Sequence, residues 1–126
     1  MSKKVIYSDG APEPIGPYSQ AIQAGNMLFI SGQIAIQRST GNILTGNIQQ
    51  ETKQVMENIS VILRAAGLGL GNVVKTTIFL KDMNNFPQVN EIYGQFFTDQ
   101  APARETVEVS RLPKDVNVEI SCIAMA

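Results

Sequence analysis

The sequence contains no histidine and a single cysteine, Cys122, among its 126 residues. Without histidine, the Ser-His and Cys-His nucleophile pairs, imidazole acid–base catalysis and histidine-ligated metals are excluded. One cysteine can form neither an internal disulfide nor a Cys-X-X-Cys site. Any chemistry must therefore come from carboxylates, arginine, lysine, tyrosine and backbone groups, and we expect no metal and no organic cofactor.

Charge bias and long apolar runs are also missing. Ten Lys and Arg residues face eleven Asp and Glu residues, and basic residues are adjacent only at Lys3-Lys4. This balance makes nucleic acid an improbable partner. No apolar run approaches the ~18 residues of a membrane span, and the N-terminus lacks the apolar segment of a signal peptide. We therefore expect no membrane association and a cytoplasmic location.

The residues that are present predict one globular domain over residues 1–126, because 44% are hydrophobic and 17% are charged. Alternation and helical spacing predict strands at 5–8, 19–24, 27–36 and 73–80, helices at 48–66 and 86–97, and two strands within 101–126. The order β-β-β-α-β-α-β-β is typical of an α+β fold, in which both helices pack on one face of a mixed sheet.

Capping signals support both helices. Asn47, with Gln50 three residues later, is a candidate N-cap for the first helix, and Gly67 follows its end in the position of a left-handed residue. Asn84-Asn85 is a candidate cap for the second helix. The glycine-rich segment 67–72 follows a helix and lacks the Lys-Ser/Thr ending of a phosphate loop, so we interpret it as a connector.

Segments 27–36 and 73–80 are apolar on both predicted faces, whereas only two helices exist to cover the sheet. This pattern predicts that a partner subunit covers the second face. Gly32, within the first of these strands, indicates a bulge or the close approach of a backbone or a ligand.

The stretch 101–126 reads as two alternating strands joined by a turn near Leu112 and Pro113. Antiparallel pairing about that turn would set Thr106 opposite Glu119 and place Arg104 on the same side as Glu119. These two charges could form a site or an ordinary cross-strand ion pair. Cys122 alternates onto the apolar face, which favours a small buried side chain over a reactive thiol.

Two further polar residues have two interpretations each. Tyr18 leaves a proline-rich loop, where it either packs on the surface or forms the wall of a pocket. Asn90 lies early in the second helix, either on a solvated polar face or at a site.

At these residues the chain resembles the reactive intermediate deaminase (RidA) family, the enamine/imine deaminases, over nearly its whole length. The matching motifs are Ala11-Pro12, Ile15-Gly16-Pro17-Tyr18, Ser31-Gly32-Gln33, Val74-Lys75-Thr76-Thr77, Lys81-Asp82, Val89-Asn90, Pro102-Ala103-Arg104, Val107-Glu108-Val109, Arg111-Leu112-Pro113-Lys114-Asp115 and Glu119. The resemblance implies a chorismate-mutase-like fold and a homotrimer with clefts between its subunits. It also implies an enzyme of the 2-iminobutanoate/2-iminopropanoate deaminase type, which hydrolyses 2-aminoacrylate, 2-iminobutanoate and related acids to 2-keto acids and ammonia.

Carried over by residue, the resemblance makes Arg104 the clamp for the substrate carboxylate and Glu119 the group that positions or activates water. It places Tyr18, Ser31, Gly32, Asn90 and Thr106 along the cleft. An arginine presents a planar fork that matches a carboxylate, and a nearby carboxylate can act as a general base.

The chain departs from the family at Glu105-Thr106, where many relatives have Ser-Cys. Thr106 still offers backbone groups to a ligand, and strand alternation should point Glu105 away from Arg104. Two other functions stay open: a ligand-sensing or regulatory module that uses the same intersubunit cleft to bind small carboxylates, and an RNA-directed role, which the charge balance disfavours.

Overall fold

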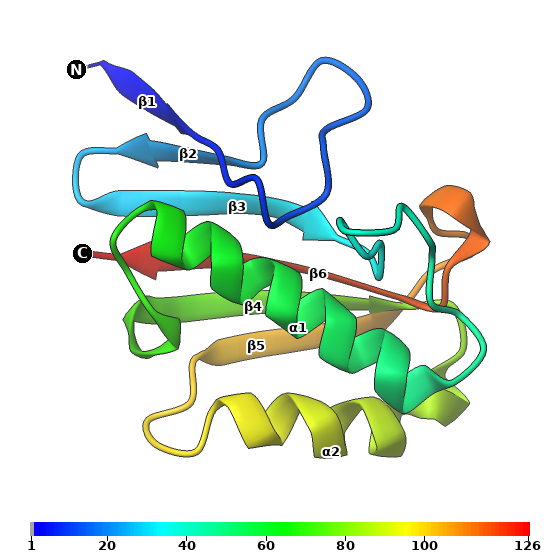
Figure 1. Ribbon diagram of the computed structural model, residues 1–126. Coiled ribbons are helices and arrows are strands. Elements are labelled where there is room, and N and C mark those ends of the chain that lie inside the picture. Colours follow the sequence, from blue (N-terminus) through cyan, green and yellow to red (C-terminus); the bar gives the residue numbers. More distant parts are fainter. Residues whose placement is uncertain (1) are drawn as a thin grey trace.

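The elements follow one another in the predicted order. The computed structural model describes residues 2–126, and Figure 1 shows the elements along the chain. They are β1 Lys3–Ile6, β2 Ala21–Ala24, β3 Met27–Gln33, α1 Ile48–Ala65, β4 Val73–Leu80, α2 Phe86–Phe96, β5 Ala103–Glu108 and β6 Val118–Met125, with 3-10 turns at Leu70–Asn72, Met83–Asn85 and Pro113–Asp115. The α+β class is confirmed.

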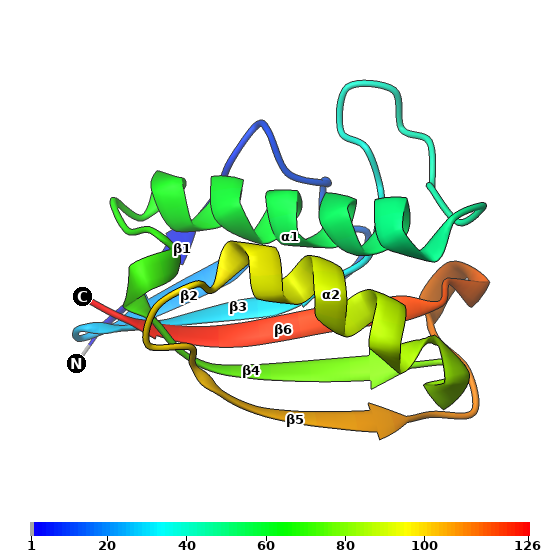
Figure 2. The ribbon, with the colours of Figure 1, turned by 90° about the horizontal axis from the view of Figure 1, so that it is seen from below.

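The six strands form one sheet in the order β1-β2-β3-β6-β4-β5. Every neighbouring pair is antiparallel except β4 and β5, which run parallel. Both helices lie on the same face of this mixed sheet, as predicted (Figure 2), and we call the other side the open face. Among the described residues, no helix is long and apolar enough to cross a membrane.

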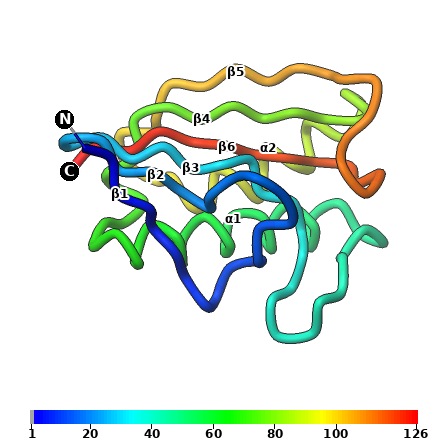
Figure 3. The backbone as a smooth tube through the Cα atoms, turned by 90° about the horizontal axis from the view of Figure 1, so that it is seen from above, coloured from blue at the N-terminus to red at the C-terminus, as the bar shows by residue number. Residues whose placement is uncertain are grey.

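The predicted hairpin of residues 101–126 is wrong. β5 pairs with β4 and β6 pairs with β4 from the other side, so β4 separates the two strands that we expected to be neighbours. Consequently Thr106 lies opposite Ile78 and Glu119 lies opposite Phe79. Viewed from above, the chain leaves β5 at the sheet edge and passes over the end of β4 to reach β6 (Figure 3).

The core lies between the sheet and the helices. Residues that alternate along the strands form its sheet side. Apolar side chains at every second position of β3, β4 and β6 face the helices, while α1 contributes one apolar stripe. The buried residues include Leu28, Ile30, Ile78, Leu80, Val118, Ile120 and Cys122 from the sheet and Val55, Met56, Ile59, Ile62 and Leu63 from α1.

The open face is also apolar, as the sequence predicted. Val5, Ile22, Phe29 and Ile123 are paired in register across four neighbouring strands. Phe29 is 43% exposed, Val74 is 44% exposed and Val107 is 40% exposed. Val107, paired with Phe79, therefore points to the open face.

The ends of several elements differ from the predicted ones for local reasons. β3 ends at Gln33, three residues before the predicted end, and Ile36 pairs instead with Ile43 in an isolated bridge. Within β3 the pairing with β6 shifts register between Ile30 and Gln33.

Asn47 caps α1 as predicted, since its side chain accepts hydrogen bonds from two backbone N–H groups. Gly67, just after the end of α1, has a φ of 75°, which is the predicted left-handed conformation. Asn85 occupies the N-cap position of α2, as predicted, but its side chain forms no capping hydrogen bond. The Asp82 side chain caps the 3-10 turn that precedes α2.

A buried carboxylate ties α1 to the start of β6. Glu51, in the first turn of α1, is fully buried. Its Oε2 accepts from the backbone N–H of Asn117 at 2.8 Å and of Val118 at 3.2 Å, and its Oε1 accepts from Asn117 Nδ2 at 2.8 Å. These bonds hold the backbone at the residue just before Glu119.

We predict that Glu51→Leu destabilises the protein by at least about 2 kcal/mol, because buried N–H groups lose their acceptor. Urea denaturation at a fixed protein concentration measures the change. Glu57→Leu, at an exposed position of the same helix, is the control and should change the free energy of unfolding by less than about 0.5 kcal/mol. Equal effects of the two substitutions would contradict the anchoring role of Glu51.

Candidate functional site

A cavity of roughly 510 Å³ opens beside the end of β3. Its walls come from the proline-rich loop after β1, from the end of β3 and the segment that follows it, from the turn before β6, and from β6 itself. The lining residues are Pro12, Glu13, Ile15, Tyr18, Gln20, Ser31, Gly32, Gln33, Ile34, Ile36, Pro113, Lys114 and Glu119. Four predicted site residues, Tyr18, Ser31, Gly32 and Glu119, are thus brought together.

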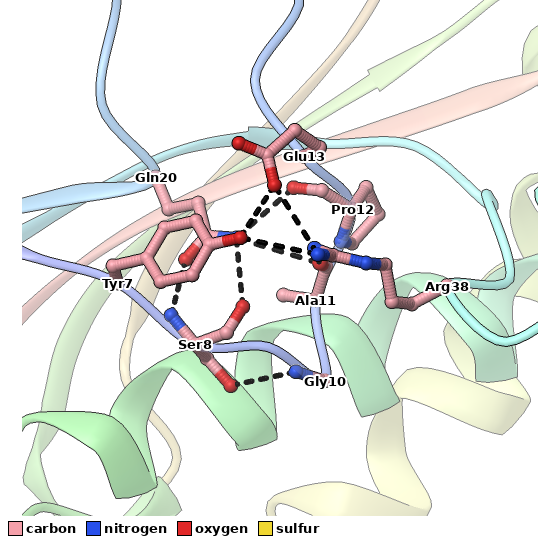
Figure 4. Close-up of polar contacts among 8 residues, drawn as sticks. All are labelled: Tyr7, Ser8, Gly10, Ala11, Pro12, Glu13, Gln20 and Arg38. Atoms are coloured by element: carbon pink, nitrogen blue, oxygen red, sulfur yellow. Dashed lines mark hydrogen bonds and ion pairs between the residues drawn. The ribbon is translucent and has the colours of Figure 1, made fainter.

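The buried amide of Gln20 holds the proline-rich loop in place (Figure 4). Its Oε1 accepts from the Ser8 N–H at 2.7 Å, and its Nε2 donates to the carbonyl oxygens of Ser8 at 3.1 Å and Pro12 at 3.0 Å. One side chain therefore satisfies several backbone groups of a segment that has no strand partner. The loop wall of the cavity is fixed from inside the protein.

A second group of contacts holds the same loop from outside (Figure 4). Arg38 Nη1 donates to the Ala11 carbonyl at 2.6 Å, and Arg38 Nη2 forms an ion pair with Glu13 at 3.2 Å. The Tyr7 hydroxyl accepts from Arg38 at 3.1 Å and donates to Glu13. These contacts position Glu13, which lines the cavity.

Glu119 points from β6 to the open face and lies directly over Gly32. A Cβ atom built on Gly32 would lie 2.2 Å from Glu119 Oε2, so only glycine leaves room for the carboxylate. Glu119 is half-buried, and this burial raises its pKa. Within residues 2–126 no side chain forms an ion pair with it, so the carboxylate remains free to accept a proton.

Tyr18 and Ser31 complete this part of the site. Tyr18 is 53% exposed at the cavity wall, and its hydroxyl accepts from the Ile15 N–H at 3.4 Å. The Ser31 hydroxyl donates to the Ser19 carbonyl at 2.6 Å, and its backbone N–H donates to the Gln20 carbonyl at 2.9 Å. Ser31 thus links β3 to the end of the proline-rich loop.

Arg104 lies elsewhere, on the side of β5 that faces α2. Its Nη1 donates to Asn90 Oδ1 at 2.7 Å, and its guanidinium carbon lies 5.4 Å from the ring centroid of Phe86 and 5.0 Å from that of Tyr93. No carboxylate within residues 2–126 forms an ion pair with it. Most of its N–H donors are therefore free for an external anion.

Thr106 lies two residues farther along the same side of β5. Its Oγ1 is buried without a hydrogen-bond partner among the described residues. Arg104, Asn90 and Thr106 thus form a second group of predicted site residues, next to α2.

The two groups lie on opposite faces of the sheet. Arg104 is paired with Thr76, whose buried side chain faces the helices, whereas Glu119 is paired with Phe79, which faces the other way. The cross-strand ion pair between Arg104 and Glu119 that the hairpin predicted is therefore absent within the chain. The structure brings the predicted site residues together as two half-sites rather than as one.

Glu105 points away from Arg104, as alternation predicted. It forms an ion pair with Lys75 Nζ at 3.1 Å on the open face and accepts a hydrogen bond from the Thr77 hydroxyl. The hydrogen bonds from Thr77 and Lys75 lower the pKa of Glu105. Its charge is paired on the open face and does not compete for Arg104.

Sequence reasoning missed several residues around the two half-sites. In the sequence, Phe86 and Tyr93 belong to an apolar helix stripe that indicates core packing before anything else, yet Phe86, Asn90 and Tyr93 have the i, i+4, i+7 spacing of one helix face. Lys114 belongs to a matching motif but was given no role in the site, and Ile36 lies beyond the end of β3; both line the cavity. Within residues 2–126, no three His, Cys, Asp or Glu side chains are grouped to hold a metal ion.

Comparison with known proteins identifies the class. The family model described as "Endoribonuclease L-PSP" matches residues 8–126. A RutC family protein of Pyrococcus horikoshii is 58% identical over 122 residues, covering 97% of each chain. Mouse 2-iminobutanoate/2-iminopropanoate deaminase is 46% identical over 123 residues, covering 98% of this chain and 91% of the mouse protein.

Solved structures of similar proteins have the same fold. Escherichia coli TdcF with bound serine superposes with a TM-score of 0.92 at 44% identity, covering 98% of both chains. The yjgF gene product of Escherichia coli gives a TM-score of 0.93 at 46% identity, covering 97% of this chain and 98% of the other. The chain belongs to the L-PSP/RutC family of Rid proteins, and the predicted RidA resemblance is confirmed.

We predict that Cys122 resists thiol reagents in the folded protein. Its side chain lies on the helix side of β6 and is 4% exposed, and burial raises its pKa to about 12. Because the thiolate is the nucleophile, alkylation at pH 8 should be at least ~100-fold slower than in urea-unfolded protein. Mass spectrometry after timed alkylation measures the ratio. Comparable rates in the two states would show that the assigned face of β6 is wrong.

Proposed function

We propose that this protein hydrolyses reactive 2-enamine and 2-imine acids, such as 2-aminoacrylate and 2-iminobutanoate, to 2-keto acids and ammonia. The observation that carries this proposal is the pair of uncompensated charges. Arg104 has no carboxylate partner, and the half-buried Glu119 has no cation partner within residues 2–126. The name of the mouse relative supports the same reaction class.

The two half-sites join when two copies of the chain meet. Arg104, Asn90 and Thr106 of one subunit would face Tyr18, Ser31, Gly32 and Glu119 of its neighbour. The apolar open face, with Phe29, Val74 and Val107 exposed, supports an assembly of this kind. A homotrimer closes this contact on itself and repeats the same cleft at each subunit boundary.

The chemistry follows from the charges. Arg104 binds the substrate carboxylate through two N–H donors, which orients the C2 atom of the imine. Glu119 accepts a proton from a water molecule, whose oxygen attacks C2 as the C=N bond becomes a C–N bond. The proton held by Glu119 and the hydroxyl proton of the adduct then pass to the nitrogen, and the C–N bond breaks as the C=O bond forms, which releases ammonia and restores the Glu119 carboxylate. An enamine such as 2-aminoacrylate first takes up a proton from water at C3, which converts it to the imine. Burial raises the pKa of Glu119 and makes it a stronger base, and such a base contributes roughly 10²- to 10⁴-fold.

A second candidate is a module that binds small carboxylates without turnover. The bound serine of TdcF favours it, because serine is a saturated amino acid and no imine. The two functions share Arg104 and differ in their need for Glu119. Turnover and binding must therefore be measured separately.

We predict that Arg104→Ala abolishes both 2-oxobutanoate binding and keto-acid formation, and that Arg104→Lys restores little, because a point charge cannot replace a planar fork. Glu119→Gln should lower turnover by at least ~10²-fold while binding persists. Calorimetry measures binding. A coupled assay with a serine or threonine dehydratase measures keto-acid formation.

Arg111→Ala and Glu57→Gln, at exposed positions, are the matched controls and should behave like the unaltered protein. Full activity of Arg104→Ala would refute the proposed reaction. Full activity of Glu119→Gln would refute the role of the base. Absence of turnover in the unaltered protein, with intact binding, would favour the sensing module.

We predict that Arg104→Ala and Glu119→Gln complement each other if the half-sites come from two subunits. Random mixing of equal amounts in a trimer leaves both groups intact in about a quarter of the clefts. Co-refolded protein should therefore regain about a quarter of full activity, while each variant alone stays inactive. Light scattering verifies the trimer, and a mixture as inactive as its components would contradict a shared site.

A further inference from the structure

Three residues on one face of α2 contact the guanidinium of Arg104. Phe86, Asn90 and Tyr93 lie one and two turns apart on α2, and all three contact the guanidinium: two through aromatic rings at 5.4 and 5.0 Å and one through a hydrogen bond of 2.7 Å. We call Phe86 and Tyr93 the aromatic bracket. Both rings lie within the ~6 Å at which a cation is attracted to a π-face.

The bracket is itself held in place. The Tyr93 hydroxyl forms a buried 2.7 Å hydrogen bond with the hydroxyl of Thr76, the residue paired with Arg104 across the sheet. The Tyr93 ring also packs against Phe97, with centroids 4.9 Å apart. Phe86 is the first residue of α2 and packs partly against the core. Both rings are therefore held by contacts that do not involve Arg104.

An exposed arginine without a carboxylate partner ordinarily samples many rotamers. A ligand that requires one orientation of the guanidinium then has to restrict the arginine to one rotamer, and this entropy cost weakens binding. Arg104 is exposed, yet the two ring contacts and Asn90 limit the planes that its guanidinium can adopt. The remaining N–H donors are left for a ligand.

We propose that Phe86 and Tyr93 are positioning residues that fix the plane of the Arg104 guanidinium for two-point binding of a substrate carboxylate. This inference rests on the proposed function, in which Arg104 binds that carboxylate. It gives the aromatic stripe of α2 a role beyond core packing. The core needs only an apolar side chain at position 86, whereas the guanidinium needs a π-face.

The test compares ring removal with ring retention in the full-length assembled protein. Phe86→Leu keeps an apolar side chain and should weaken 2-oxobutanoate binding about fivefold. Phe86→Tyr keeps the π-face and should bind within about twofold of the unaltered protein. Phe96→Leu makes the same change on the same helix, away from Arg104, and is the matched control. Calorimetry gives the dissociation constants, and thermal melting verifies folding.

A spectroscopic measurement separates positioning from general loosening. A ring above a guanidinium shifts the NMR signal of its Nε–H group, so the Arg104 signal should move in Phe86→Leu and stay in Phe96→Leu and Phe86→Tyr. Arg104→Ala identifies the signal by its absence. Tyr93→Phe, which retains the ring, should keep the signal near its original position.

The outcomes separate the two proposals. Unchanged binding and an unmoved signal in Phe86→Leu, with binding lost in Arg104→Ala, would overturn the bracket and leave the proposed function intact. Equal weakening by Phe86→Leu and Phe96→Leu would also overturn the bracket. Unchanged binding in Arg104→Ala would overturn the carboxylate clamp itself.

Discussion

β4 lies between β5 and β6, and the positions of Arg104, Thr106 and Glu119 depend on this pairing. Side chains alternate along each strand, so the registers with β4 fix which face each residue takes. Arg104 shares the helix side with Thr76, and Glu119 shares the open face with Phe79. Because the sheet itself stands between the two charges, chemistry that needs both of them requires a second chain.

Three buried polar side chains hold the irregular segments that surround the Glu119 cavity. Gln20 binds the backbone of the proline-rich loop, and Glu51 binds the backbone before β6. Asn58 donates from α1 to the carbonyl oxygens of Ile34 and Ile36 at 3.0 Å. Each replaces hydrogen bonds that a strand partner would have supplied. The cavity walls are therefore held by buried side-chain hydrogen bonds, although they contain little regular structure.

Local chemistry explains which predictions were correct. Alternation and helical spacing located β4 and α1 closely, and the residue motifs led to the correct family. The errors lie where a nonlocal contact decides. The predicted hairpin failed because β4 lies between β5 and β6, and β3 ends at Gln33 because Ile36 pairs with Ile43 rather than with β6. Helical spacing correctly indicated that Phe86 and Tyr93 pack toward the core, but spacing does not show that Arg104 lies against the same rings.

The sequence by itself determined the chemical inventory: no histidine, one shielded cysteine, and an arginine and a glutamate as the candidate charges. It also determined the order of elements and the two apolar faces of the sheet, because side-chain periodicity is a local property. Only the tertiary structure decided that β5 pairs with β4 rather than β6. Alternation within β5 is compatible with either neighbour. The choice depends on how α2 returns the chain to the start of β4, so that β5 runs parallel beside β4 at the edge of the sheet.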